Sequence, residues 1–298
     1  MAKGRVLVTG RHGFTGHYVA NALGKAGWEV WGGCSHPTDE MSPLDKVADL
    51  TDAISVTQMV NDVRPDAVVH LAGIAFVGHG SVDDFYHVNL LGTRNLLDAL
   101  SKGGHGQSGV VLASSANVYG NTRVSLIAES TLPAPANDYA VSKLAMEYMA
   151  KLFANQLPIA ITRPFNYTGV GQDAKFLVPK IVSHFRQRAP HIELGNLDVA
   201  RDFSDVRDVA AVYAALLDDR SLAGETVNIC SGRAIALGGI IDMCRSITGH
   251  NLEVSVNPAF VRTDEIKTLN GDPSRVNKLL GGVVRHRFEE TLRWMLEA

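Results

Sequence analysis

The chain has 298 residues, of which 46% are hydrophobic and 20% charged, and its formal net charge is −3 at pH 7. This balance excludes a disordered chain, and the small net charge does not indicate a nucleic-acid or membrane partner. No segment approaches the roughly 20 consecutive apolar residues that a membrane helix needs.

The cysteine count indicates thiols rather than disulfides. Cys34, Cys230 and Cys244 form an odd set without a C-x-x-C pair, so we expect reduced, buried thiols in a cytoplasmic protein. The apolar run within the opening MAKGRVLVTG is too short for a signal peptide. The 11 histidines show no metal-ligand spacing, so we expect no bound metal.

Short apolar runs alternate with longer amphipathic stretches in the first half of the chain. The short runs are typical of strands buried in a parallel sheet, and the longer ones have helical spacing. This alternation predicts an α/β fold with a doubly wound parallel sheet over residues 1–163. In chain order we predict strand Arg5–Thr9, helix Thr15–Ala26, strand Glu29–Gly32, helix Thr51–Asn61, strand Ala67–Ala72, helix Asp83–Lys102, strand Gly109–Ala113, helix Asn137–Gln156 and strand Ile159–Arg163.

Beyond residue 163 the alternation loosens, and glycines cluster at Thr168–Gln172. We expect residues 164–298 to form mainly a smaller C-terminal α/β substrate-binding lobe, with the chain crossing back to the sheet. Its predicted elements are helix Phe176–Arg188, strand His191–Leu194, helix Val206–Asp218, strand Thr226–Cys230 and helix Leu237–Thr248.

A glycine-rich loop, TGRHGFTG at residues 9–16, joins the first strand to the first helix. The first glycine permits a tight turn, the second lets the backbone approach a pyrophosphate, and the third lets helix and strand pack closely. The helix N-terminus then offers N–H groups and partial positive charge to the phosphates. The loop therefore predicts dinucleotide binding by Gly10, Arg11, Gly13, Phe14, Thr15 and Gly16.

The residues after the second strand bear on which dinucleotide binds. An acid there would hold the ribose 2′-hydroxyl of NAD, but residues 31–36 read WGGCSH and contain none. Arg11 and His36 are instead suited to a 2′-phosphate, so we favour NADP(H) over NAD(H). Asp49, followed by Leu50, either accepts a hydrogen bond from the adenine amino group or caps a turn.

Tyr139 and Lys143 are four residues apart on a predicted helix and therefore share one face. A tyrosine pKa of about 10 suits acid–base catalysis at neutral pH poorly, and a nearby ammonium lowers it. Ser115 follows a predicted strand at the carboxyl edge of the sheet, where ligands bind in such folds. These three residues are our candidate catalytic set, whereas Ser114 is expected to be structural.

The loop TGRHGFTG, the segments VNLLGTRNLLDAL and SSANVYG, and the motif YAVSK together resemble the extended short-chain dehydrogenase/reductase family of nucleotide-sugar epimerases, dehydratases and reductases. The resemblance covers nearly the whole chain. It implies a Rossmann-type fold, catalysis by Ser115, Tyr139 and Lys143, and a homodimer paired through a four-helix bundle. It also implies that Lys143 holds the nicotinamide ribose and that Leu71, Ala72, Gly73 and Asn89 adjoin the cofactor.

Two further segments bear on the substrate, which the resemblance implies is a nucleotide diphosphate sugar. RPFNYTGVGQ at residues 163–172 and RDFSDVRDVA at residues 201–210 are most similar to the family's GDP-4-keto-6-deoxy-D-mannose reductases. By this resemblance Asn166 and Arg201 bind the substrate diphosphate, and Arg262 is a second candidate. Asp205 and Asp208 are expected to cap the following helix.

Asn117 argues for a reductase rather than a dehydratase. The family's dehydratases have a glutamate after the catalytic Ser or Thr, and an amide does not exchange a proton at neutral pH. We assign Asn117 to substrate binding and expect reduction of a C4 ketone with NAD(P)H. An NAD-dependent 4-epimerase uses the same three groups and remains the alternative. A non-catalytic NADP-sensing protein is a second alternative, which an intact catalytic set disfavours.

Overall fold

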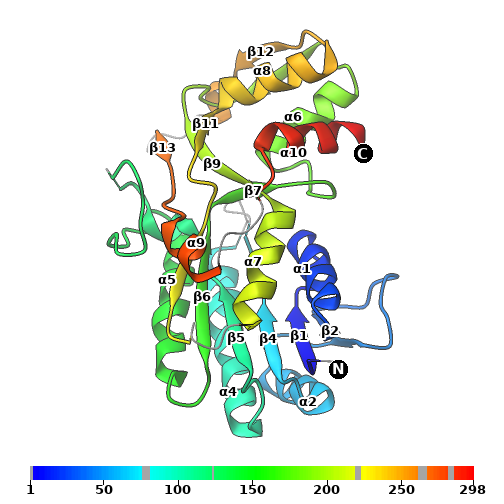
Figure 1. Cartoon of the computed structure of the whole chain (residues 1–298), viewed down its shortest axis with the longest axis vertical. Coiled ribbons are helices and arrows are strands. Elements are labelled where there is room, and N and C mark those ends of the chain that lie inside the picture. The colour runs from blue at the N-terminus through cyan, green and yellow to red at the C-terminus, as the bar shows by residue number, and fades with distance from the viewer. Residues whose placement is uncertain (1–2, 76–80, 123, 219–222, 261–266, 281–284) are drawn as a thin grey trace. The chain divides into compact units, whose positions relative to one another are not determined.

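The computed structural model describes residues 3–75, 81–122, 124–218, 223–260, 267–280 and 285–298 (Figure 1). The chain forms two compact units, each built from several stretches of sequence. The first comprises residues 1–120, 132–164 and 210–227, and the second comprises residues 121–131, 165–209 and 228–298. Within the described ranges, no helix is long and apolar enough to cross a membrane.

The first unit is built on a seven-stranded sheet in the order β10-β6-β5-β4-β1-β2-β3. Within this sheet β6, β5, β4, β1, β2 and β3 pair in parallel with their neighbours, which confirms the predicted doubly wound Rossmann sheet. The sheet's strands are β1 (Arg5–Thr9), β2 (Glu29–Cys34), β3 (Asp45–Val47), β4 (Ala67–His70), β5 (Gly109–Ala113), β6 (Ile159–Pro164) and β10 (Thr226–Ile229).

Helices cover the sheet because its strands are apolar on both faces. Side chains of α2, α4 and α5 form one continuous core with strand residues such as Leu7, Val68 and Leu112. α1 and the part of α7 from Ala210 onward lie on the other face (Figure 1). The helical elements of this unit are α1 (Phe14–Lys25), α2 (Ala53–Val63), α3 (Val82–Asp84), η1 (Phe85–Gly92), α4 (Thr93–Gly103), η2 (Ala116–Tyr119), α5 (Asp138–Ala150) and η3 (Lys151–Phe153), with α7 (Val206–Asp218) shared between the units.

One predicted helix differs in detail from the structure. The segment predicted as helix Asp83–Lys102 is helical throughout, but η1, which makes up most of its first half, is a π-helix rather than an α-helix. A π-helix has wider turns, and such turns are frequent at functional sites. Asn89 lies in this wide segment and is fully buried.

The second unit contains short strands that frame a separate apolar core, centred on residues such as Phe185, Leu194 and Ile240. Its small sheets have the orders β11-β9-β13, with β7 paired to β9, and β12-β8. The elements are β7 (Asn166–Thr168), α6 (Leu177–Arg186), β8 (His191–Leu194), β9 (Ala200–Asp205), β11 (Ala234–Ala236), α8 (Leu237–Thr248), β12 (Glu253–Val256), η5 (Pro258–Phe260), β13 (Thr268–Leu269), α9 (Ser274–Leu280) and α10 (Phe288–Glu297).

Candidate active site

The loop between β1 and α1 has the close packing that a dinucleotide-binding turn requires. Gly10 has a φ of +72°, and a Cβ there would lie 2.9 Å from the Ala72 backbone nitrogen. A Cβ on Gly16 would lie 2.1 Å from the Gly10 carbonyl oxygen. Helix α1 begins after Gly13, which has no side chain with which to cap it. The loop is therefore suited to placing backbone N–H groups against a pyrophosphate.

Beside this loop, a carboxylate from β3 occupies the space over the end of β2. A Cβ on Gly32 would lie 1.9 Å from Asp45 Oδ1, so Asp45 fills the place of the missing side chain. Asp45 is buried and accepts hydrogen bonds from the Arg11 guanidinium and from the backbone and hydroxyl of Ser42. Burial alone would raise the pKa of Asp45, but these bonds lower it.

The other two residues considered for the adenosine end have local partners. The His36 ring is 2.8 Å from the Ser35 hydroxyl in an exposed position. Asp49 accepts hydrogen bonds from the backbone and the hydroxyl of Thr51, both at 2.8 Å. Asp49 therefore stabilises a turn, which is one of the two roles expected for it.

A chain of hydrogen bonds fixes the loop after β4. The Thr93 hydroxyl donates to the Asn89 carbonyl, so it accepts from His70 Nε2, and His70 Nδ1 then accepts from Thr9. Burial lowers the pKa of His70 to about 3, and the charge of Lys143 acts in the same direction. His70 is therefore neutral and structural.

Asn89 links that loop to α5, the helix that carries Tyr139 and Lys143. Its side chain bonds both backbone groups of Ile74 and also donates to Ser142 on α5. A Cβ on Gly73 would lie 2.7 Å from Asn89 Oδ1 and 3.3 Å from Lys143 Nζ. The Gly73 backbone therefore lies directly beside Lys143, with no room for a larger residue.

Ser115 lies two residues after β5, Lys143 on α5 reaches the last residue of β5, and Tyr139 lies one helical turn before Lys143. Ser115, Tyr139 and Lys143 are all buried, and Lys143 Nζ donates to the Ala113 carbonyl at 2.8 Å. Ser115 Oγ accepts hydrogen bonds from the backbone and side-chain amides of Asn117 at 3.2 and 3.1 Å. Burial lowers the pKa of Lys143 to about 8, although the charge of Glu147 acts in the opposite direction.

Two of the candidate substrate residues lie on neighbouring strands of the second unit. Asn166 on β7 pairs with Phe203 on β9, and Arg201 is two residues before Phe203. Arg201 Nη1 donates to the Ala200 carbonyl, and both Asn166 and Arg201 are half-buried. Arg262, the third candidate, lies outside the described residues.

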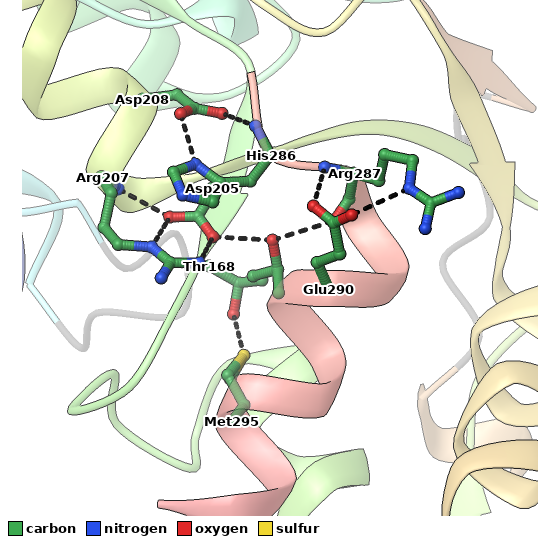
Figure 2. A network of polar contacts seen from close by, with 9 residues as sticks. Thr168, Asp205, Arg207, Asp208, His286, Arg287, Glu290 and Met295 are labelled. Atoms are coloured by element: carbon green, nitrogen blue, oxygen red, sulfur yellow. Dashed lines mark hydrogen bonds and ion pairs between the residues drawn. The ribbon is translucent and has the colours of Figure 1, made fainter. Parts of the chain in front are cut away.

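Asp205 joins the start of α7 to α10. It accepts from the backbone and guanidinium of Arg207, as expected of a cap (Figure 2). It also accepts from the Thr291 hydroxyl on α10. Asp208 accepts from the backbone and ring of His286, at 2.8 and 2.6 Å. Both carboxylates therefore anchor the C-terminal segment, a role that the sequence did not reveal. Asp205 also caps α7 as expected, whereas Asp208 lies inside that helix and binds His286 instead.

The sequence interpretation missed three buried groups near the candidate site, namely Asp45, Glu147 and Arg163. Glu147 stands four residues after Lys143, so its place on the same helix face was readable. Its bond to Arg163 on β6 was not. Among the described residues, no cluster of three or more His, Cys, Asp or Glu side chains could hold a metal ion.

Comparisons with known proteins agree with this geometry. Residues 6–230 match the model of the NAD dependent epimerase/dehydratase family. The chain is 36% identical to GDP-6-deoxy-D-talose 4-dehydrogenase of Aggregatibacter actinomycetemcomitans, covering 94% of this chain and 92% of the relative. It is 33% identical to GDP-6-deoxy-D-mannose reductase of Pseudomonas aeruginosa, covering 98% and 96%. A structure of the P. aeruginosa protein RMD complexed with NADPH covers 99% of this chain and 98% of that one, with 30% identity and a TM-score of 0.85.

Proposed function

Because the chain belongs to the NAD dependent epimerase/dehydratase family, the extended short-chain dehydrogenases/reductases, we propose that it reduces the C4 ketone of a nucleotide-diphospho-4-keto-6-deoxyhexose with NADPH. The observation that supports the proposal is that Lys143 on α5 donates to the last residue of β5, two residues before Ser115, while Tyr139 lies one helical turn away on the same helix. The two relatives named above support a GDP-linked 6-deoxyhexose as the substrate.

The phosphate loop and the Lys143 amine would hold the cofactor, which supplies the hydride when bound. Within the chain, Asn117 donates twice to Ser115 Oγ, which directs the Ser115 hydrogen elsewhere and suits it to donate to a ketone oxygen. Tyr139 donates a second hydrogen bond to that oxygen and then transfers its proton. The charged Lys143 amine, one helical turn away, stabilises the phenolate that forms.

Asn117 supports reduction rather than dehydration. Elimination of water from the sugar requires a group that exchanges a proton, and an amide does not do so at neutral pH. In this structure the Asn117 side chain is also engaged with Ser115 at 3.1 Å. We propose that Asn166 and Arg201 bind the substrate diphosphate, and that Arg262 assists them.

A 4-epimerase is the second candidate function, because the same three groups would serve it. Such an enzyme oxidises C4 first and then returns hydride to the opposite face of the sugar, so its cofactor is regenerated. A non-catalytic NADP-binding protein would not need the buried Tyr139 and Lys143 pair.

We propose NADP(H) as the preferred cofactor. The end of β2 carries Gly32, Gly33 and Cys34 rather than an acid, and Arg11 lies beside it with a partly exposed guanidinium. Asp45 accepts a hydrogen bond from one nitrogen of that guanidinium. This bond holds the Arg11 side chain in place and also offsets part of the Arg11 charge. The preference over NAD(H) is therefore expected to be moderate.

We further propose that the protein is a homodimer that pairs α5 and the η1–α4 helix of two chains. α5 and η3 expose Val141, Tyr148 and Leu152 at spacings of seven and four residues, and η1 exposes Leu91. This spacing places the first three on one helix face, which suits a helix-bundle interface. The free thiols of the three cysteines support a reducing compartment such as the cytoplasm.

The test is to incubate the purified protein with NADPH and a panel of 4-keto-6-deoxy and ordinary nucleotide sugars. We expect stoichiometric loss of NADPH absorbance with the keto sugars. Tyr139→Phe should bind NADPH normally and lose turnover by ~100-fold or more. Sugar interconversion without net NADPH loss would establish the epimerase instead, and full turnover by the variant would remove Tyr139 from the mechanism.

A further inference from the structure

Glu147 forms the centre of a buried polar network beneath the candidate active site. Its carboxylate accepts hydrogen bonds from Ser114 Oγ at 2.5 Å and from Arg163 Nε and Nη2 at 2.9 and 2.6 Å. Arg163 Nη1 in turn donates to the Tyr119 hydroxyl at 3.0 Å. Glu147 and Arg163 are 3% and 7% exposed. Burying such a pair has a desolvation cost that often cancels its attraction, so stability alone does not explain it.

The network ties the catalytic helix to the strand end that carries the candidate serine. Lys143 and Glu147 are one turn apart on α5, and they bond to consecutive residues of the chain after β5. Lys143 donates to the Ala113 carbonyl, and Glu147 accepts from the Ser114 hydroxyl. Ser115 follows directly. Two adjacent contacts therefore fix α5 against the segment that bears Ser115.

Few charges balance the Lys143 ammonium inside the protein. His70 faces it from β4 but is neutral, because burial lowers the pKa of His70 to about 3. Tyr139 is the neighbour one turn earlier on α5, and Glu147 is the neighbour one turn later. Arg163 on β6 and Tyr119 on η2 lie beyond Glu147 and bond to each other. Among the described groups of this network, Glu147 is therefore the one carboxylate near Lys143, and its negative charge favours the charged form of Lys143.

Arg163 bonds to both oxygens of the Glu147 carboxylate. Two-point, charge-assisted bonds of this kind are among the stronger hydrogen bonds in proteins. Burial alone would lower the pKa of Arg163, but Glu147 raises it well above its ordinary value. The carboxylate of the pair lies on the face of α5 that carries Lys143, whereas the guanidinium comes from β6.

We propose that Glu147 is a positioning residue of this enzyme, whose Arg163-bound carboxylate keeps the Lys143 amine protonated in a water-excluded site and fixes α5 to the strand end beside Ser115. This inference rests on the proposed function, because it assumes that charged Lys143 assists Tyr139. Glu147 acts through Lys143 and does not itself touch substrate.

Replacing the carboxylate changes the pH dependence in a defined direction. Reduction requires Lys143 charged and Tyr139 protonated, so kcat/KM falls as the pH rises through the titration of the pair. Glu147→Gln removes a negative charge and therefore favours proton loss from both groups. We expect the fall of kcat/KM at high pH, the basic limb of the profile, to move to lower pH by ~1 unit or more. Glu147→Asp keeps the charge and should leave the limb within ~0.3 units of the wild-type position.

A double variant protects the test against misfolding. Glu147→Gln leaves the Arg163 charge buried and unpaired, whereas E147Q/R163M removes both charges, which buried pairs often tolerate. The double variant should fold and should show the limb displaced in the same direction but by less, because loss of the Arg163 charge offsets part of the change. If E147Q and the double variant lose activity equally at every pH while the limb stays in place, Glu147 is structural only and the inference is overturned.

A second readout separates this inference from the proposed function. In the full chain with 13Cε-labelled lysine, the Lys143 signal can be identified by its loss in Lys143→Arg and titrated by NMR. We expect a midpoint near pH 8 in the wild type, a lower one in E147Q, and a wild-type value in E147D. If the protein shows no turnover but the Lys143 midpoints differ between variants as expected, only the proposed reaction is refuted. Equal midpoints in wild type and E147Q would refute the role of Glu147.

Discussion

Gly16→Ala is the sharpest test of the phosphate loop. A Cβ at position 16 would lie 2.1 Å from the carbonyl oxygen of Gly10 and 2.5 Å from that of Arg11, whereas ordinary contacts begin at 3.4 Å. Both neighbours are backbone atoms, so the variant cannot relieve the clash by turning a side chain. The turn itself must move by roughly 1 Å, which close-packed interiors resist.

The magnitude follows from the bonds that this movement strains. The Gly10 N–H donates to Gly33 at 2.8 Å, and the Gly13 N–H donates to Gly10 at 3.0 Å. Overpacking destabilises a protein by about 1–3 kcal/mol. Alanine stabilises a helix by about 1 kcal/mol relative to glycine, which offsets part of that loss. We therefore expect the free energy of unfolding to fall by up to about 2 kcal/mol. The Kd for NADPH should rise about tenfold or more, because the displaced N–H groups no longer meet the phosphates at hydrogen-bonding distance.

Urea unfolding of the cofactor-free protein and a fluorescence titration with NADPH measure the two effects separately. Gly24→Ala is the matched control, because it lies in the same helix and a Cβ there meets no described atom within 4 Å. The control should be stabilised by up to about 1 kcal/mol and should bind NADPH normally. If G16A binds NADPH as tightly as G24A, the loop does not hold the phosphates as described.

Four further predictions concern single contacts. Arg11→Ala should raise the Kd for NADPH about tenfold and leave that for NADH nearly unchanged in parallel titrations; equal effects would remove Arg11 from 2′-phosphate binding. Leu152→Glu should shift a dimer toward monomer in sedimentation velocity, and an unchanged mass would exclude the α5 face. Asp202→Asn should lower the free energy of unfolding by about 2–4 kcal/mol, because the buried carboxylate accepts from Ser231, Gly232 and Gly271, whereas Asp198→Asn in an exposed pair should change little. In the folded state burial lowers the pKa of His70 to about 3, so the unfolded chain binds more protons below about pH 6.5 and the free energy of unfolding falls on acidification. His70→Gln should make this pH dependence of stability weaker, as measured by urea titrations at several pH values. An unchanged pH dependence would contradict a neutral buried His70.

Much of the sheet could be predicted because its signals are local. Each buried strand is a short apolar run, and each helix repeats its apolar residues at helical spacing. The predicted strands Arg5–Thr9 and Gly109–Ala113 coincide with β1 and β5. The phosphate loop and the Tyr139–Lys143 spacing were equally readable, since each is set by residues within a few positions of one another.

The features that were not predicted depend on contacts between distant residues. Asp45 reaches the space over Gly32 because β2 and β3 pair in register, and 13 positions of sequence separate the two residues. The Glu147–Arg163 bond likewise joins a helix to a strand. The short strands β7, β9, β11 and β13 lack a clear alternation of apolar and polar residues and are defined by their pairing. The π-helical turn of η1 keeps the helical hydrophobic pattern, so the pattern does not distinguish it from an α-helix.

The central claim is that Tyr139 and Lys143 act together on a ketone at C4 of the sugar. Turnover with NADPH carrying deuterium at the transferable position, followed by NMR of the sugar product, tests it most directly. We expect one deuterium at C4 for each NADPH oxidised, and none detectable with Tyr139→Phe. Deuterium at another carbon, or product formed without oxidation of the cofactor, would contradict the claim.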